Sequence, residues 1–181
     1  MKKIIVLFSM VLLCGCVTQK FKKFKAGVKI VSLERIDSYE VPKSILFEFE
    51  GHTHKIYYYL DLSEKLKASF KESSIRIHFN YNLKASNPLK EDLKITPKHK
   101  YDSKNYEFVG KVNFLALNSS KSYVNVKNRK VNYTVSFTFS KKNIIALEYV
   151  FDVNSYFTIL TQSTKLSKLL FEKITFKPPM Q

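Results

Sequence analysis

The chain has 181 residues, a formal net charge of +16 and a hydrophobic content of 45%. This length and composition suit one folded domain with a sizeable core. Both cysteines, Cys14 and Cys16, lie within the first sixteen residues, so the remaining chain has no disulfide and no thiol for catalysis or metal binding.

The first sixteen residues are typical of a secretory signal. Lys2 and Lys3 give a basic start, and an apolar run follows from Ile4 to Leu13. The run is too short to span a bilayer, which needs about twenty apolar residues, and its order of basic, apolar and small residues is that of a signal peptide. The sequence LCGC at 13–16 resembles the lipobox of bacterial lipoproteins, with Leu three residues before the cysteine and a small residue directly before it.

This resemblance implies that Cys16 carries a diacylglycerol, that residues 1–15 are removed and that the new N-terminus is acylated. More than one acyl chain makes the attachment stable, because each buried CH₂ adds about 0.8 kcal/mol. Val17 stands where an Asp would resemble a signal for inner-membrane retention. The resemblance therefore implies an envelope location, at the outer membrane if the bacterium has two membranes. The alternative is an ordinary cleaved signal peptide with a chance cysteine.

A basic segment follows the candidate anchor. Its lysines alternate with phenylalanines, in the order Lys20, Phe21, Lys22, Lys23, Phe24 and Lys25. We expect this segment to face an anionic membrane surface, where each lysine contributes about 1 kcal/mol; the alternative is a solvated linker that its charges keep extended. The chain is therefore divided into a signal peptide (1–15), a lipidated cysteine with a basic tether (16–25), and a single β-rich domain (26–181).

From residue 27 onward the hydrophobic pattern has mainly a period of two, which is typical of strands with one buried and one wet face. The strands predicted in this way are 28–31, 45–49, 56–60, 75–83, 108–117, 123–126, 131–139 and 145–153. The segment 51–54 lies between two of them and predicts a hairpin. Polar breaks at 118–121, 127–130 and 140–143 predict tight connections in a meander. A lysine-rich stretch at 84–104 predicts a long loop.

Two stretches have helical spacing. Asp61 and Glu64 stand at the spacing of a capping box and predict the start of a short helix. Near the C-terminus, four apolar residues share one helical face: Leu166, Leu169, Leu170 and Ile174. The predicted fold is mainly β, of the β-rich α+β class: an antiparallel sheet, sandwich or half-barrel with one or two short helices, the C-terminal one packed on the sheet.

The sequence predicts no catalytic site and no cofactor. The four glycines are too far apart for a phosphate-binding loop or a nucleophile elbow. His52 and His54 are weak candidates for a metal site, because two residues apart in a strand share one face; an exposed hairpin tip is the simpler interpretation. Glu48 and Glu50 also share a strand face, as glycosidase carboxylates could, but surface ion pairs explain them more simply. An envelope hydrolase stays an unsupported alternative.

Loss of Lys2 and Lys3 with the signal lowers the formal charge from +16 to +14. Such a charge usually suggests nucleic acid, but export argues against that partner and favours an acidic glycolipid or an envelope protein. An AT-rich genome would enrich lysine as well. We expect a non-catalytic binding module held to the membrane by the lipid on Cys16. The alternative is a carrier of a lipid or other hydrophobic ligand, in a sheet cavity lined by the tyrosines at 57–59.

Overall fold

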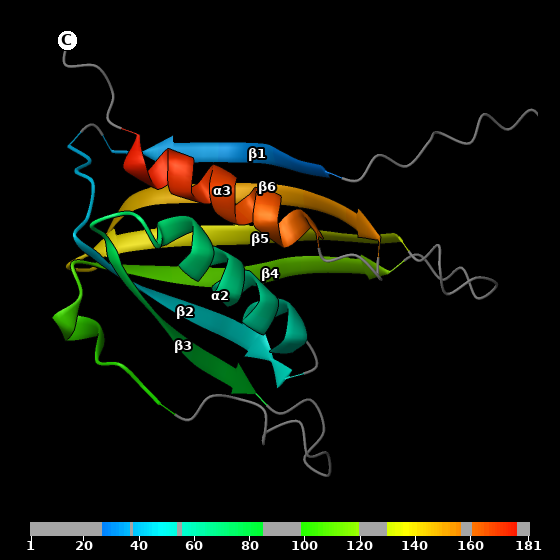
Figure 1. Ribbon diagram of the computed structural model, residues 1–181, viewed down its shortest axis with the longest axis horizontal. Coiled ribbons are helices and arrows are strands. Elements are labelled where there is room, and N and C mark those ends of the chain that lie inside the picture. Colours follow the sequence, from blue (N-terminus) through cyan, green and yellow to red (C-terminus); the bar gives the residue numbers. More distant parts are fainter. Residues whose placement is uncertain are drawn as a thin grey trace, which may run out of the picture.

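The computed structural model describes residues 27–36, 38–53, 56–84, 99–119, 130–156 and 161–176. In this part of the chain, two α-helices lie on one face of a six-stranded sheet (Figure 1). The elements in chain order are β1 (Gly27–Arg35), β2 (Ser44–His52), α2 (Ile56–Phe70), β3 (Arg76–Lys84), the 3₁₀ turn η3 (Ser103–Asn105), β4 (Phe108–Ser119), β5 (Lys130–Lys141), β6 (Ile144–Tyr156) and α3 (Thr161–Thr175).

The sheet is open, with strand order β1-β6-β5-β4-β2-β3. Neighbours among β4, β5, β6 and β1 are antiparallel, and β4, β5 and β6 follow one another as in a meander. The strand predicted at 123–126 lies outside the described residues. β2 is instead parallel to both β3 and β4, because α2 carries the chain back across the sheet between β2 and β3. The β-rich α+β class and the packing of the C-terminal helix on the sheet are confirmed, whereas the sheet is mixed rather than antiparallel throughout.

The predicted hairpin at 51–54 and strand at 56–60 are wrong. The chain leaves β2 and enters α2 at Ile56, five residues before the predicted cap at Asp61. The buried residues Ile56, Tyr59 and Leu66 follow a helical period along α2, although the first five residues of the helix also fit a strand pattern. Tyr57 is consequently exposed on the helix surface and Tyr59 is buried in the core, so these tyrosines belong to a helix and not to a strand of the sheet.

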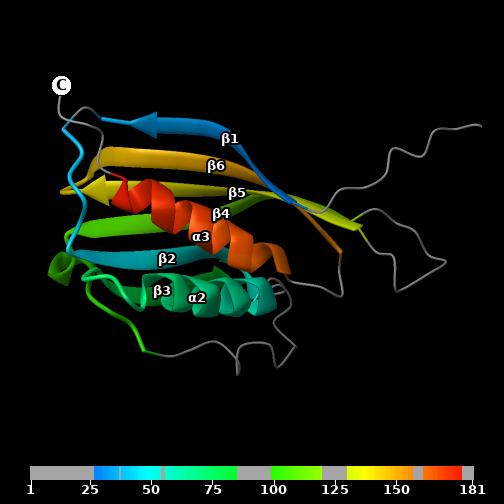
Figure 2. The same cartoon turned by 45° about the horizontal axis from the view of Figure 1, so that its top comes forward.

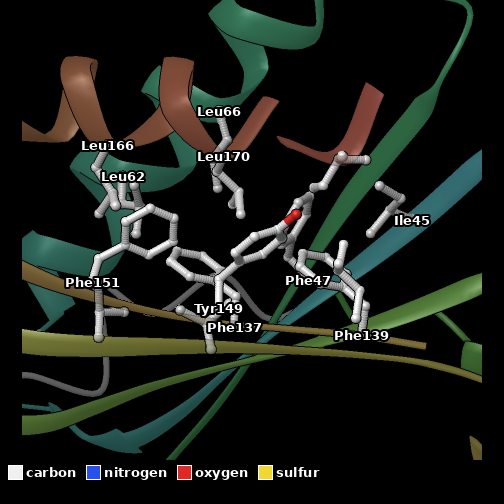
Figure 3. Close-up of a cluster of buried hydrophobic side chains, with 14 of the residues drawn as sticks. Ile45, Phe47, Leu62, Leu66, Phe137, Phe139, Tyr149, Phe151, Leu166 and Leu170 are labelled. Atoms are coloured by element: carbon white, nitrogen blue, oxygen red, sulfur yellow. The ribbon is translucent and has the colours of Figure 1, made fainter. Parts of the chain in front are cut away.

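The core lies between the sheet and the two helices (Figure 3). Large aromatic side chains of the central strands are fully buried, among them Phe47, Phe137 and Phe151. Leu62 of α2 and Leu170 of α3 reach down onto these rings (Figure 3). Each such side chain contributes about 1.5–3 kcal/mol by its burial. Every member of this core lies between residues 39 and 174.

The two ends of the sheet are distinct. β1 begins at Gly27, which is paired with Asn154 near the end of β6. Just after the end of β1, the amide of Ile36 donates a hydrogen bond to the carbonyl of Ala146, near the start of β6, over 3.2 Å. The β5–β6 turn, the end of β1 and the end of α3 therefore share one end of the sheet (Figures 1 and 2). The chain enters β1 at the other end, about 30 Å away for nine extended residues. Neither α2 nor α3 is long and apolar enough to cross a membrane.

Candidate functional site

The β5–β6 turn places a lysine in an unfavourable backbone conformation. Lys141 and Ile144 are paired across the hairpin, so the loop consists of Lys142 and Asn143 alone. Both have positive φ angles, 49° and 68°, as a two-residue type I′ turn requires. Asn and Gly suit such positions, whereas another residue there costs about 1–2 kcal/mol. The chain thus keeps an exposed lysine where a different residue would fold more easily.

A hollow of about 410 Å³ lies on one side of this turn. Its lining combines three lysines with three hydroxyl-bearing residues: Lys104, Lys141 and Lys142 with Ser103, Tyr106 and Ser140. One acidic residue, Glu107, also lines it. Ammonium groups beside hydroxyl donors favour an oxygen anion such as a phosphate or carboxylate. We name this space the cationic hollow.

The segment 99–107 brings Lys104 and Tyr106 to the cationic hollow. The buried Asn80 of β3 fixes the start of this segment, because its side-chain amide donates to the Tyr101 carbonyl and accepts from the Tyr101 amide, both over 2.9 Å. The Tyr106 hydroxyl lies 2.8 Å from His78 Nδ1. The side chain of Asp102 accepts the amide of Lys104 and caps η3. Lys104 is therefore presented from a braced turn.

Glu107 is fully engaged by its neighbours at the edge of the cationic hollow. Its carboxylate accepts the amide of Lys43 over 2.8 Å and the amine of Lys141 over 3.0 Å. These donors lower the pKa of Glu107, and the hydrogen bond to Glu107 raises the pKa of Lys141. Lys141 also lies 3.7 Å from Glu40. Lys141 therefore forms ion pairs with two carboxylates, whereas Lys142 and Lys104 have no ion-pair partner among the described residues.

A second hollow of about 370 Å³ lies on the other side of the same turn. Lys141 and Lys142 line it as well, but most of its lining is apolar: Ile36, Tyr39, Phe108, Ile144 and Ala146. We name this space the apolar hollow. The hairpin tip thus borders a space with three lysines and a space with more apolar residues, and Lys142 belongs to both linings.

The described residues that the sequence singled out line neither hollow. Cys16 and the tether at 20–25 lie outside the described residues, as do His54 and residues 85–98 of the predicted loop. His52 is exposed at the end of β2, and no group of three or more potential ligands for a metal occurs in the part of the chain that the structure describes. Glu50 pairs with Lys111 at 3.8 Å, and neither it nor Glu48 lines either hollow.

The hollows could not be predicted from the sequence, because their lining comes from three segments that are far apart in the chain: 36–40, 103–109 and 140–146. The one usable signal was the sequence Lys-Lys-Asn at 141–143, in a break that was correctly predicted as a tight connection. A two-residue hairpin loop has a positive φ at its first residue, and in type I′ at both, so a lysine at the first position is unusual.

No protein-family model matches the chain, and no curated protein matches it significantly. Solved structures to which the chain is similar include the PelC dodecamer from Paraburkholderia phytofirmans, at 10% identity and a TM-score of 0.44, with 81% of this chain and 94% of that chain covered. A variant of the same protein gives 7% identity, the same TM-score, and coverage of 81% and 93%. A minor lipoprotein from Acinetobacter baumannii gives 13% identity and a TM-score of 0.36, with 73% and 90% covered. At these values the similarities assign neither a family nor a function.

Proposed function

We propose that this protein is a lipid-anchored, non-catalytic component of a bacterial cell envelope that binds an acidic group in the cationic hollow. The observation that carries the binding role is Lys142, an amine without an ion-pair partner in the described structure, held on a strained turn at the rim of that hollow. Strained residues persist where the surrounding structure determines them, and they gather at functional sites.

The composition of the hollow supports a ligand with localised negative charge. Lys104 comes from the braced η3 turn and Lys142 from the β5–β6 turn, and Ser103 of η3 and Ser140 of β5 line the same hollow. Hydrogen bonds with a charged partner are about twice as strong as neutral ones. An acidic glycolipid or an acidic segment of an envelope protein offers such groups.

The position of the hollow in the fold supports a ligand outside the anchoring membrane. The candidate anchor, Cys16, precedes Gly27, which lies at the opposite end of the sheet from Lys142. The nine residues of β1 separate the two ends by about 30 Å. An upright domain would therefore present the cationic hollow away from the membrane that holds it, at the outer membrane in a bacterium with two membranes.

The binding role is tested by a matched pair of substitutions in the mature chain, residues 16–181. Lys142→Gln removes the amine at the hollow, and Lys165→Gln makes the same change on the exposed surface of α3. We expect Lys142→Gln to weaken the binding of pyrophosphate about tenfold in isothermal titration calorimetry, the equivalent of one charge-assisted hydrogen bond. Equal affinities for the two variants would refute the role of the hollow.

The anchor is tested separately in cells. Labelled palmitate should be incorporated into the chain, and Cys16→Ser should abolish the label, because the thiol of Cys16 is the proposed attachment point. A wild-type chain that stays unlabelled would refute the lipid anchor while leaving the anion-binding role open to its own test.

A further inference from the structure

The apolar hollow adjoins the cationic hollow and is built from side chains that are already fixed. The hydroxyl of Tyr39 donates to the carbonyl of Ile174 over 2.8 Å, and its ring meets Phe108 edge to face at a centroid distance of 5.9 Å. The guanidinium of Arg35 lies 4.6 Å from the centre of the same ring. Tyr39, Phe108 and Ala146 are each at most 8% exposed. The floor of the apolar hollow is therefore preformed, as ligand sites usually are.

The walls of the apolar hollow are free to meet a ligand. Ile36 is 39% exposed and Ile144 is 67% exposed, and both line the hollow. Exposed branched side chains are unfavourable in water, and covering them with an apolar group is favourable.

The charges at the two hollows differ in a way that orients a ligand. The cationic hollow has three lysines and one carboxylate, Glu107, which Lys43 and Lys141 hold, whereas the apolar hollow has two lysines and one carboxylate, Glu40. Lys142 lines both spaces. An anionic group is thus best placed at Lys142 on the side of Lys104, with an attached alkyl chain passing over the turn into the apolar hollow.

We propose that the ligand is an anionic amphiphile, whose phosphate or carboxylate binds at Lys142 and Lys104 and whose alkyl chain occupies the apolar hollow. This inference rests on the proposed function and names the class of its acidic ligand. Burial of each methylene group should raise the affinity about fourfold. A chain of several carbons should therefore bind far more tightly than the bare anion.

Decyl phosphate, kept below the concentration at which it forms micelles, is the probe. It is titrated calorimetrically into residues 16–181 carrying Cys16→Ser, a chain that retains the whole core between residues 39 and 174. Inorganic phosphate and decanol are the controls for the head group and the chain. We expect decyl phosphate to bind at least about a hundredfold more tightly than inorganic phosphate, and decanol to bind more weakly than decyl phosphate.

A second set of variants locates the alkyl chain. The double substitution Ile36→Ser, Ile144→Ser removes two exposed walls of the apolar hollow and spares its buried floor. Leu115→Ser is the matched control, since Leu115 is 61% exposed and lines neither hollow. The double variant should lose at least about tenfold in affinity for decyl phosphate and keep its affinity for inorganic phosphate, and the control should keep both.

The outcomes separate this inference from the proposed function. Equal binding of decyl phosphate and inorganic phosphate would overturn the amphiphile and preserve the anion site, whereas absence of both would overturn both proposals. If a peptide that ends in a free leucine carboxylate bound more tightly than decyl phosphate, the proposal of an amphiphile as the ligand would also be overturned. Vesicles containing phosphatidylglycerol distinguish a lipid in a bilayer from a free amphiphile. If the vesicles bind the wild-type chain and not the double variant, the ligand is a lipid in a bilayer. If the chain binds decyl phosphate but not the vesicles, the ligand is a free amphiphile.

Discussion

Replacement of Lys142 by Asn should stabilise the fold and weaken the binding of an anion. Lys142 has a φ of 49° in a two-residue turn, and its side chain is exposed. The left-handed region costs most residues about 1–2 kcal/mol, and Asn is one of the few that adopt it readily. We therefore expect Lys142→Asn to raise the free energy of unfolding by about 0.5–1 kcal/mol.

Urea unfolding followed by circular dichroism measures this change. A gain of 1 kcal/mol corresponds to an increase in melting temperature of about 2–4 °C for a domain of this size. The control is Lys165→Asn in α3, where the same substitution should lower the stability slightly because Asn has a lower helix propensity than Lys. The expected pair of results for Lys142→Asn is higher stability together with weaker pyrophosphate binding.

A lower stability for Lys142→Asn would refute the strain at the turn, and an unchanged affinity would refute the role of the amine. Both quantities are measured because replacement of a lysine with no role in binding would change the stability and leave the affinity for pyrophosphate the same. Natural proteins often retain destabilising residues where activity needs them, and this variant measures that exchange at one position.

Three further perturbations test the frame that holds the site. Asn80→Ala should lower the free energy of unfolding by about 1–3 kcal/mol, because the amide and carbonyl of Tyr101 lose the two hydrogen bonds that the buried Asn80 side chain makes; a loss below about 0.5 kcal/mol in urea unfolding would show that these hydrogen bonds are dispensable. Leu170→Ala should cost about 2–5 kcal/mol by leaving a cavity between α3 and the sheet, measured by thermal unfolding, and a near-neutral result would contradict the packing of α3. The pKa of Glu107 is lowered in the folded state, so its contribution to stability is present above its unfolded pKa of about 4.3 and is lost as the pH falls through the folded pKa. Glu107→Gln should flatten the pH dependence of unfolding in that acidic range, and an unchanged slope would refute the role of this carboxylate.

Period-two alternation predicted most of the sheet because most strands bury one face only. The strands β3, β5 and β6 show this well, with apolar side chains towards the helices and polar ones on the other face. The pattern fails at Tyr57, Tyr58 and Tyr59, since an apolar run of five residues fits a strand and the first turn of a helix equally. The helix is chosen by its later residues, where Leu62 and Leu66 continue the buried face of Tyr59.

Strand direction and the hollows depend on contacts between distant segments. Nothing local in β2 specifies that it runs parallel to β3, since this follows from the crossover through α2. Leu46 is fully buried although it alternates with Ile45 and Phe47, which belong to the core beneath the helices. The two hollows likewise arise only when the end of β1, η3 and the β5–β6 turn meet at one end of the sheet (Figure 1).

An acidic ligand should bind beside Lys142, at the end of the sheet opposite Gly27. Backbone amide chemical shifts of the mature chain, followed during titration with pyrophosphate, report the location of binding as well as its strength. We expect saturable shifts at residues 103–107 and 140–144, and no shifts at Gly27 or at the start of α3. Shifts spread evenly over the exposed lysines, or confined to the end of the sheet that contains Gly27, would contradict this expectation.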